Sequence, residues 1–167
     1  WIKKKLEEKG YGVEIPEMPD TDNPSITLWI DKLEKVLKNV DDETILIGHS
    51  IGCQTIMRYL EKSSENIKFR KVIFIAPWLN LIGIEKEGNE VRDIARPWLE
   101  IPIDFEKVKS HFEKLICFFS DNDKYVSLFQ LSDFENLLGA EAVLLNHRGH
   151  FDKESNVKDL PEMVDYI

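Results

Sequence analysis

Short apolar runs rich in β-branched and aromatic residues recur along this chain, with longer stretches of helical periodicity between them. Four runs lack the polar alternation of a half-exposed strand, which predicts strands that are buried on both faces. They cover residues 44–47, 71–76, 115–119 and 142–145. A fifth, short strand is predicted at residues 11–15, where Pro16 ends the run.

The intervening stretches carry apolar residues three or four positions apart, which predicts amphipathic helices. The predicted helices cover residues 1–9, 23–39, 51–62, 104–114, 127–138 and 157–167. Buried strands that alternate with helices indicate an α/β fold, in which a mostly parallel sheet is covered by helices on both faces. We therefore expect a three-layer architecture in one domain spanning residues 1–167.

Residues 78–102 interrupt this alternation with two tryptophans, two prolines, two glycines and little clear period. Segments of this length without regular structure are uncommon in compact domains and are often functional. We expect residues 78–102 to form a cap or lid beside a functional site.

Composition narrows the classes of function. The chain is 43% hydrophobic and 32% charged, as in soluble globular proteins, and its 31 acidic against 22 basic residues give a net charge of −9. This acidity disfavours nucleic acid as a partner, and no apolar run approaches the roughly 18 residues that span a bilayer. Cys53 and Cys117 lie in apolar runs without metal-ligand spacing, which indicates buried free thiols in a reducing, cytoplasmic compartment.

The segment Gly48-His49-Ser50-Ile51-Gly52 has the pattern G-x-S-x-G between a predicted strand and a predicted helix. In a nucleophile elbow the serine occupies a strained corner from which its hydroxyl projects, and the flanking glycines lack Cβ atoms that would clash there. The helix N-terminus directs N–H groups at the site, and the backbone N–H of Ile51 is the expected oxyanion donor. This pattern predicts Ser50 as a nucleophile.

A nucleophilic serine requires a base and a residue that orients the base, in the chain order Ser, acid, His for this elbow. Asp121 and Asp123 follow one predicted strand, and His147 and His150 follow the next, so that all reach the same sheet edge. Both pairs leave a choice. We favour Asp123 because it lies further from its strand, and His150 because Gly149 frees the backbone to turn inward.

The alternatives have ordinary structural interpretations. His147 reads as a surface or hydrogen-bonding histidine, and Asp121 as a carboxylate that caps its turn. His49, inside the elbow, is expected to pack or to form a local hydrogen bond. His111 lies in a charged helical stretch and is expected to be solvated.

Beyond single motifs, the chain resembles the retinoblastoma-binding-protein-9-like, or YdeN-like, serine hydrolases of the α/β-hydrolase fold over nearly its whole length. The matching residues are 17–19, Trp29, 48–53, 58–60, Ala76-Pro77, 103–105, 120–123, Tyr125-Val126 and 149–151. The resemblance implies a triad of Ser50, Asp123 and His150 that acts on small acyl esters without a metal or cofactor.

The chain departs from this family at two places. Lys124 stands where the family usually has a proline, which alters the rigidity of the loop. The family also opens with a strand and a His-Gly loop that ends near a tryptophan, and Trp1 matches that tryptophan. We therefore expect the first strand to be missing from this chain, together with one oxyanion donor, a loss of about 10²–10³ in rate.

The leading hypothesis is a serine hydrolase that cleaves a small-molecule acyl ester through an acyl-enzyme, with Trp78 and Trp98 as candidates for the acyl pocket. Acyl transfer to an acceptor other than water fits the same residues. The alternative from another class is a catalytically weak or inactive protein-interaction module on this fold, whose contact surface for a protein partner would be residues 78–98.

Overall fold

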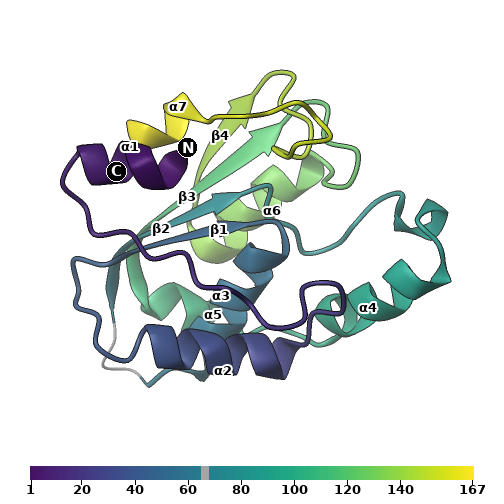
Figure 1. Ribbon diagram of the computed structural model, residues 1–167. Coiled ribbons are helices and arrows are strands. Elements are labelled where there is room, and N and C mark those ends of the chain that lie inside the picture. Colours follow the sequence, from purple (N-terminus) through teal and green to yellow (C-terminus); the bar gives the residue numbers. More distant parts are fainter. Residues whose placement is uncertain (65–67) are drawn as a thin grey trace.

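Four parallel strands form a single sheet in the computed structural model, which describes residues 1–64 and 68–167 (Figure 1). The strands lie side by side in chain order: β1 (Ile45–His49), β2 (Phe69–Ile75), β3 (Phe112–Ser120) and β4 (Glu141–Leu145). In the register, Ile47 pairs with Ile73 and Ile73 with Ile116. All three pairings are parallel, so the carboxyl ends of the strands meet at one edge, as the sequence predicted.

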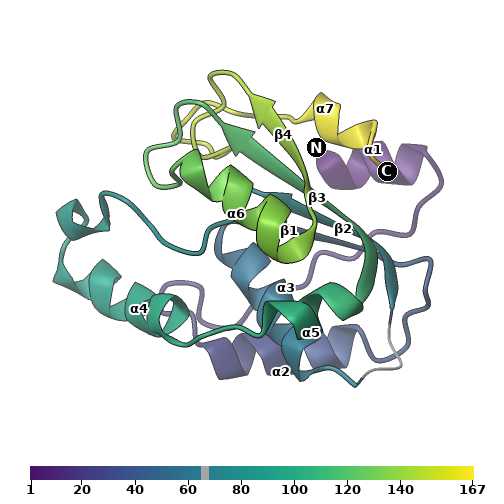
Figure 2. The same cartoon turned by 180° about the vertical axis from the view of Figure 1, so that it is seen from behind.

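Helices cover both faces of this sheet. They are α1 (Ile2–Glu8), α2 (Ile26–Val36), α3 (Ile51–Lys62), α4 (Asn89–Glu100), α5 (Phe105–Ser110), α6 (Phe129–Leu138) and α7 (Pro161–Val164), with a short 3₁₀ turn at Ile84–Lys86. Figures 1 and 2 place α1 and α7 together on one face, with α3, α5 and α6 on the other and α2 against α3. Within the described ranges, no helix is long and apolar enough to cross a membrane.

Two apolar clusters, one on each face, hold these layers together. Alternate residues of β2 serve different clusters: Val72 and Phe74 join the larger one against α3 and α6, whereas Ile73 joins the smaller one with Leu160 and Met163. All five side chains are buried. Burial of both faces of one strand explains why its sequence is apolar without alternation.

The helix predicted at residues 104–114 is shorter than expected. It ends at Ser110, and Phe112 to Lys114 instead open β3, where they pair with β2. Tertiary pairing here overrides the local helical pattern. The prediction that His111 is solvated was therefore wrong, because the turn between α5 and β3 buries it completely. At the chain's end, α7 begins only at Pro161, a residue suited to the first turn of a helix.

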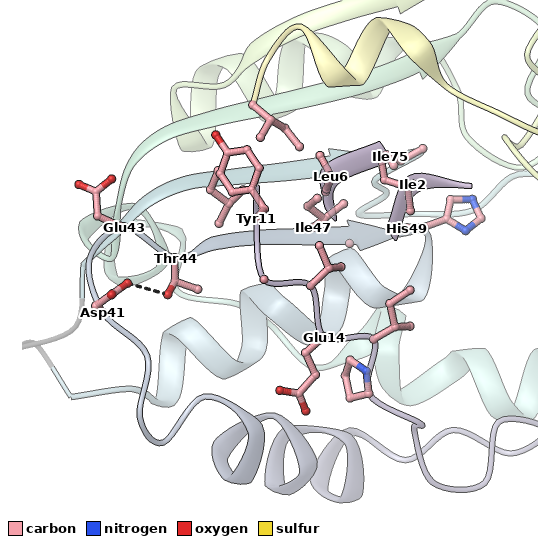
Figure 3. A pocket seen from close by; sticks show the side chains of 17 residues that line it. Ile2, Leu6, Tyr11, Glu14, Asp41, Glu43, Thr44, Ile47, His49 and Ile75 are labelled. Atoms are coloured by element: carbon pink, nitrogen blue, oxygen red, sulfur yellow. Dashed lines mark hydrogen bonds between the residues drawn. The ribbon is translucent and has the colours of Figure 1, made fainter. Parts of the chain in front are cut away.

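The strand predicted at residues 11–15 is not formed. The segment is irregular and lies across a cavity of about 700 Å³ from β1, the edge strand of the sheet (Figure 3). Ile2 and Leu6 of α1 and Ile47 of β1 contribute apolar side chains to the lining. A strand requires backbone partners, and among the described residues this segment pairs with no strand of the sheet.

Residues 78–102 contain more regular structure than their pattern indicated, because α4 occupies twelve of them. This helix projects from the sheet on the side away from α1 and α7 (Figures 1 and 2). Its C-terminal end is held by Arg58, whose Nη2 donates to the backbone oxygens of Trp98 at 2.9 Å and Ile101 at 2.8 Å. That residues 78–102 form a lid stays a prediction.

Candidate active site

Ser50 occupies the sharp turn between β1 and α3, with φ 50° and ψ −118°. This left-handed conformation is strained for a residue with a side chain, and such strain concentrates at functional sites. Two backbone hydrogen bonds hold the turn: the N–H of Ser50 donates to the oxygen of Ile75 at 2.9 Å, and the N–H of Cys53 donates to the oxygen of Ser50 at 2.9 Å. Hydrogen bonds to β2 on one side and within the start of α3 on the other thus fix the backbone of Ser50.

The two glycines of the G-x-S-x-G segment have different roles. A Cβ on Gly48 would lie 2.9 Å from the backbone nitrogen of Cys53 and 3.0 Å from the side chain of Ile56. Only a residue without a side chain allows α3 to pass this close to β1. A Cβ on Gly52 would meet nothing within 4 Å, so the expectation of a clash there was wrong.

A chain of hydrogen bonds connects Ser50, His150 and Asp123. His150 Nε2 lies 2.8 Å from Ser50 Oγ, and His150 Nδ1 lies 2.8 Å from Asp123 Oδ2. The Asp123 and His150 side chains are only 2% and 10% exposed. Because a carboxylate only accepts hydrogen bonds, Nδ1 carries the imidazole proton and Nε2 is left to accept the proton of the serine hydroxyl.

Asp123 is itself held in place by the loop that follows it. Its Oδ1 accepts the backbone N–H groups of Tyr125 at 2.8 Å and Val126 at 3.1 Å. One carboxylate oxygen thus fixes the loop while the other faces His150. These bonds leave the carboxylate few alternative orientations.

Asp121 and His147 were the alternatives to Asp123 and His150, and both make contacts outside the chain of hydrogen bonds that contains Ser50. Asp121 Oδ1 accepts the backbone N–H of His147 at 2.7 Å, and the His147 side chain is 85% exposed. The expected surface position of His147 is confirmed. Asp121 does not cap its own turn but joins the loop after β3 to the loop after β4.

Ser120 and Asn122 add to that connection, and sequence reasoning missed both. Ser120 Oγ accepts the N–H of Arg148 at 3.0 Å, and Asn122 Oδ1 accepts the N–H of Gly149 at 2.7 Å. The signal was present as four consecutive polar residues directly after a buried strand. Side chains of the acid loop therefore set the backbone path that delivers His150.

Two aromatic rings flank the imidazole of His150. The ring centroids of His49 and Tyr125 lie 5.3 Å and 5.2 Å from its own. Tyr125 also joins residues 78–102 to the site, because its backbone oxygen accepts the N–H of Ile82 at 2.9 Å and its hydroxyl donates to Glu87 at 3.1 Å. The segment between β2 and α5 thus contacts the surroundings of His150.

Trp78 and Ile51 lie beside Ser50, whereas Trp98, the other candidate for an acyl pocket, has a different hydrogen-bond partner. Trp78 Nε1 is 3.3 Å from Ser50 Oγ, whereas Trp98 is buried and donates from its indole to the oxygen of Pro24 at 3.1 Å. Ile51 opens α3, where a backbone N–H has no acceptor within its own helix. Across residues 1–64 and 68–167, no group of three or more His, Cys, Asp or Glu side chains is placed to hold a metal ion.

Known proteins resemble this chain in sequence and in fold. The chain is 28% identical to the serine hydrolase RBBP9 of Rattus norvegicus over 152 residues, which are 90% of this chain and 76% of the relative. The crystal structure of the ydeN gene product of Bacillus subtilis superposes with a TM-score of 0.88 at 22% identity, covering 99% of this chain and 86% of that one. A structure from work on Nitrososphaera gargenis carboxylesterases shares the fold with a TM-score of 0.67 at 14% identity, covering 99% and 81%.

The family comparison covers the full length of the chain. The profile of the serine hydrolase family matches residues 1–167, which include the strained serine, the hydrogen-bonded histidine and the buried aspartate described above. The chain therefore belongs to the serine hydrolase family.

Proposed function

We propose that this protein hydrolyses carboxylic esters of small acyl groups, with Ser50 as nucleophile, His150 as general base and Asp123 as the residue that orients the base. The observation that carries the proposal is the hydrogen-bonded chain from Ser50 Oγ through His150 to Asp123, with both contacts at 2.8 Å. Its members lie in the strained turn and in the two loops at the carboxyl edge of the sheet.

The reaction follows from the directions of these hydrogen bonds. Ser50 Oγ bonds to the carbonyl carbon of the ester as its proton passes to His150 Nε2, and the carbonyl electron pair moves onto oxygen. The carbon–oxygen bond to the alcohol then breaks, and His150 returns the proton to the alcohol. Water, deprotonated by the same nitrogen, then bonds to the acyl carbon. The bond from that carbon to Ser50 Oγ breaks, the carboxylic acid leaves, and His150 returns the proton to Ser50 Oγ. Asp123 stabilises the imidazolium at each proton transfer.

The developing oxyanion requires preorganised donors. The backbone N–H of Ile51 is the donor that we assign, since it opens α3 beside the nucleophile and the positive end of the helix dipole adds to it. The preference for esters follows the fold neighbours that are named carboxylesterases, and it is tested directly by turnover of p-nitrophenyl acetate and butyrate.

The deciding experiment is labelling with a fluorophosphonate probe, followed by mass spectrometry to locate the adduct. We expect one adduct on Ser50, its loss in Ser50→Ala, and a fall in p-nitrophenyl acetate hydrolysis of at least about 10³-fold in that variant. Ser110→Ala is the matched control, because Ser110 Oγ donates to the Lys107 carbonyl at the end of α5 and lies outside the site. It should keep the adduct.

An adduct on another residue, or none on the folded protein, would contradict the proposal. The second result would favour the alternative of a non-catalytic interaction module, in which the hydrogen-bonded chain has no chemical role. Circular dichroism of the labelled sample establishes that the protein tested is folded.

A further inference from the structure

Trp78 brings a hydrogen-bond donor to the nucleophile. It lies three residues beyond the end of β2, and its indole Nε1–H points at Ser50 Oγ across 3.3 Å. The residue is only 3% exposed. A buried indole N–H needs an acceptor, and here that acceptor is the reacting oxygen of the site.

Two buried glutamines hold the backbone that carries this indole. Gln54 of α3 donates from Nε2 to the oxygen of Trp78 at 2.7 Å. Gln130 of α6 accepts the N–H groups of Leu79 at 2.6 Å and Asn80 at 3.1 Å, and donates to the oxygen of Asn80 at 2.9 Å. Both glutamines are 1% exposed. Burial of an amide is costly unless it is hydrogen-bonded, and these amides direct their bonds to one three-residue segment.

The hydroxyl of Ser50 has one proton to donate and two lone pairs that accept. The proton is directed to His150 Nε2, and one lone pair accepts the indole N–H of Trp78. The second lone pair is therefore the one left to attack a carbonyl carbon. Two of the three directions around Oγ are fixed by protein groups, so the direction of attack is fixed as well.

We infer that Trp78 is a further catalytic residue of this site, whose indole N–H occupies one lone pair of Ser50 Oγ and so directs the other at the carbonyl carbon. The inference rests on the proposed function. A nucleophile held in the direction of attack reacts faster, because less orientational freedom is lost on reaching the transition state. Gln54 and Gln130 are positioning residues that act through Trp78.

Trp78→Phe removes the N–H and keeps an aromatic ring, although a smaller one. We expect it to slow fluorophosphonate labelling of Ser50, and acylation by p-nitrophenyl acetate, by about tenfold. Trp29→Phe is the matched control, since Trp29 is also buried and loses one indole hydrogen bond, to the oxygen of Pro19 at 2.7 Å. It should lower the melting temperature but leave the labelling rate within about twofold of wild type.

A spectroscopic measurement tests the contact without relying on turnover. The chain has four tryptophans, whose indole ¹⁵N–¹H signals can be assigned with single Trp→Phe variants. Ser50→Ala removes the acceptor, so the Trp78 indole proton should shift upfield while that of Trp29 stays in place.

These measurements separate the failure of each proposal. Labelling of Trp78→Phe at the wild-type rate, or a Trp78 signal that Ser50→Ala does not move, would overturn the role of Trp78 alone. A folded wild-type protein that is not labelled at all would instead contradict the proposed function. Slow labelling of Trp78→Phe together with the upfield shift supports the inference.

Discussion

His49 Nε2 lies 2.8 Å from the backbone carbonyl oxygen of His150, so the residue before the proposed nucleophile is hydrogen-bonded to the proposed general base. A carbonyl oxygen only accepts hydrogen bonds, which places a proton on His49 Nε2. The contact spans the end of β1 and the loop after β4, two segments separated by about a hundred residues of sequence. It ties the position of the His150 backbone to the elbow itself.

Replacement of His49 by phenylalanine should slow ester hydrolysis. His49→Phe keeps a ring beside His150 but loses the donor, and we expect kcat/KM to fall about three- to tenfold. His49→Gln should restore most of the rate, because its side-chain amide can donate to the same oxygen. Initial rates with p-nitrophenyl acetate, alongside melting curves for each variant, check this. Equal rates for both variants would assign the effect to the imidazole ring rather than to the hydrogen bond.

The two aspartates of the acid loop form a matched pair for mutation. In Asp123→Asn an amide NH₂ can face His150 Nδ1, which forces the proton onto Nε2 and removes the acceptor for the Ser50 hydroxyl. We expect kcat to fall by about 10³–10⁴-fold while the protein stays folded. Asp121→Asn keeps an oxygen for the N–H of His147, so its activity should change little. A large loss in Asp121→Asn alone would reverse the assignment of the acid. Single-turnover acylation rates separate this chemical effect from substrate binding.

The thiols of the two cysteines should be unreactive in the folded protein. Cys53 and Cys117 are completely buried, and burial raises the pKa of each thiol far above its ordinary value. The thiolate is the reactive form, so neither thiol should react with Ellman's reagent at pH 8 until the protein unfolds. Titration in denaturant should then give two thiols per chain. Rapid reaction of one thiol under native conditions would show that the core opens locally at that residue.

The four strands were predictable because each is a short apolar run, and in β2 and β3 burial on both faces removes the polar alternation. β1 and β4 are apolar as well, although Ile47 and Leu144 are exposed. Where long-range pairing decided the structure, local pattern failed. Phe112 to Lys114 resemble the end of a helix but pair with β2, and residues 11–15 resemble a strand but lie across a cavity from β1. In both cases the outcome depended on whether a strand lies beside the segment in the folded protein. The spacing of apolar residues within the segment does not contain that information.

In the candidate site, too, some residues were predicted from the sequence and others were missed. Ser50, Asp123 and His150 were predictable because each follows a recognisable strand, and parallel strands bring their carboxyl ends together. The contacts of Ser120, Asn122 and Trp78 were missed, because each is a hydrogen bond whose partner lies in a segment remote in sequence. Trp78 had been considered for an acyl pocket on composition alone. Two buried glutamines that no motif identified are hydrogen-bonded to the backbone of Trp78 and Leu79.

The glycines of the elbow offer a test of what the G-x-S-x-G pattern requires in this protein. Gly48→Ala would place a Cβ 2.9 Å from the backbone of α3, and relief of that overlap requires β1 and α3 to separate. We expect a loss of about 1–3 kcal/mol in the free energy of unfolding. Gly52→Ala meets open space within the first turn of α3, and alanine is the better helix former by about 0.8–1.0 kcal/mol. It should therefore stabilise the fold. Urea unfolding of both variants measures the difference. Equal destabilisation would contradict the expectation that Gly52 is unconstrained by space. A loss of kcat/KM in Gly52→Ala without a loss of stability would instead show that Gly52 is needed for the approach of the substrate to the N–H of Ile51.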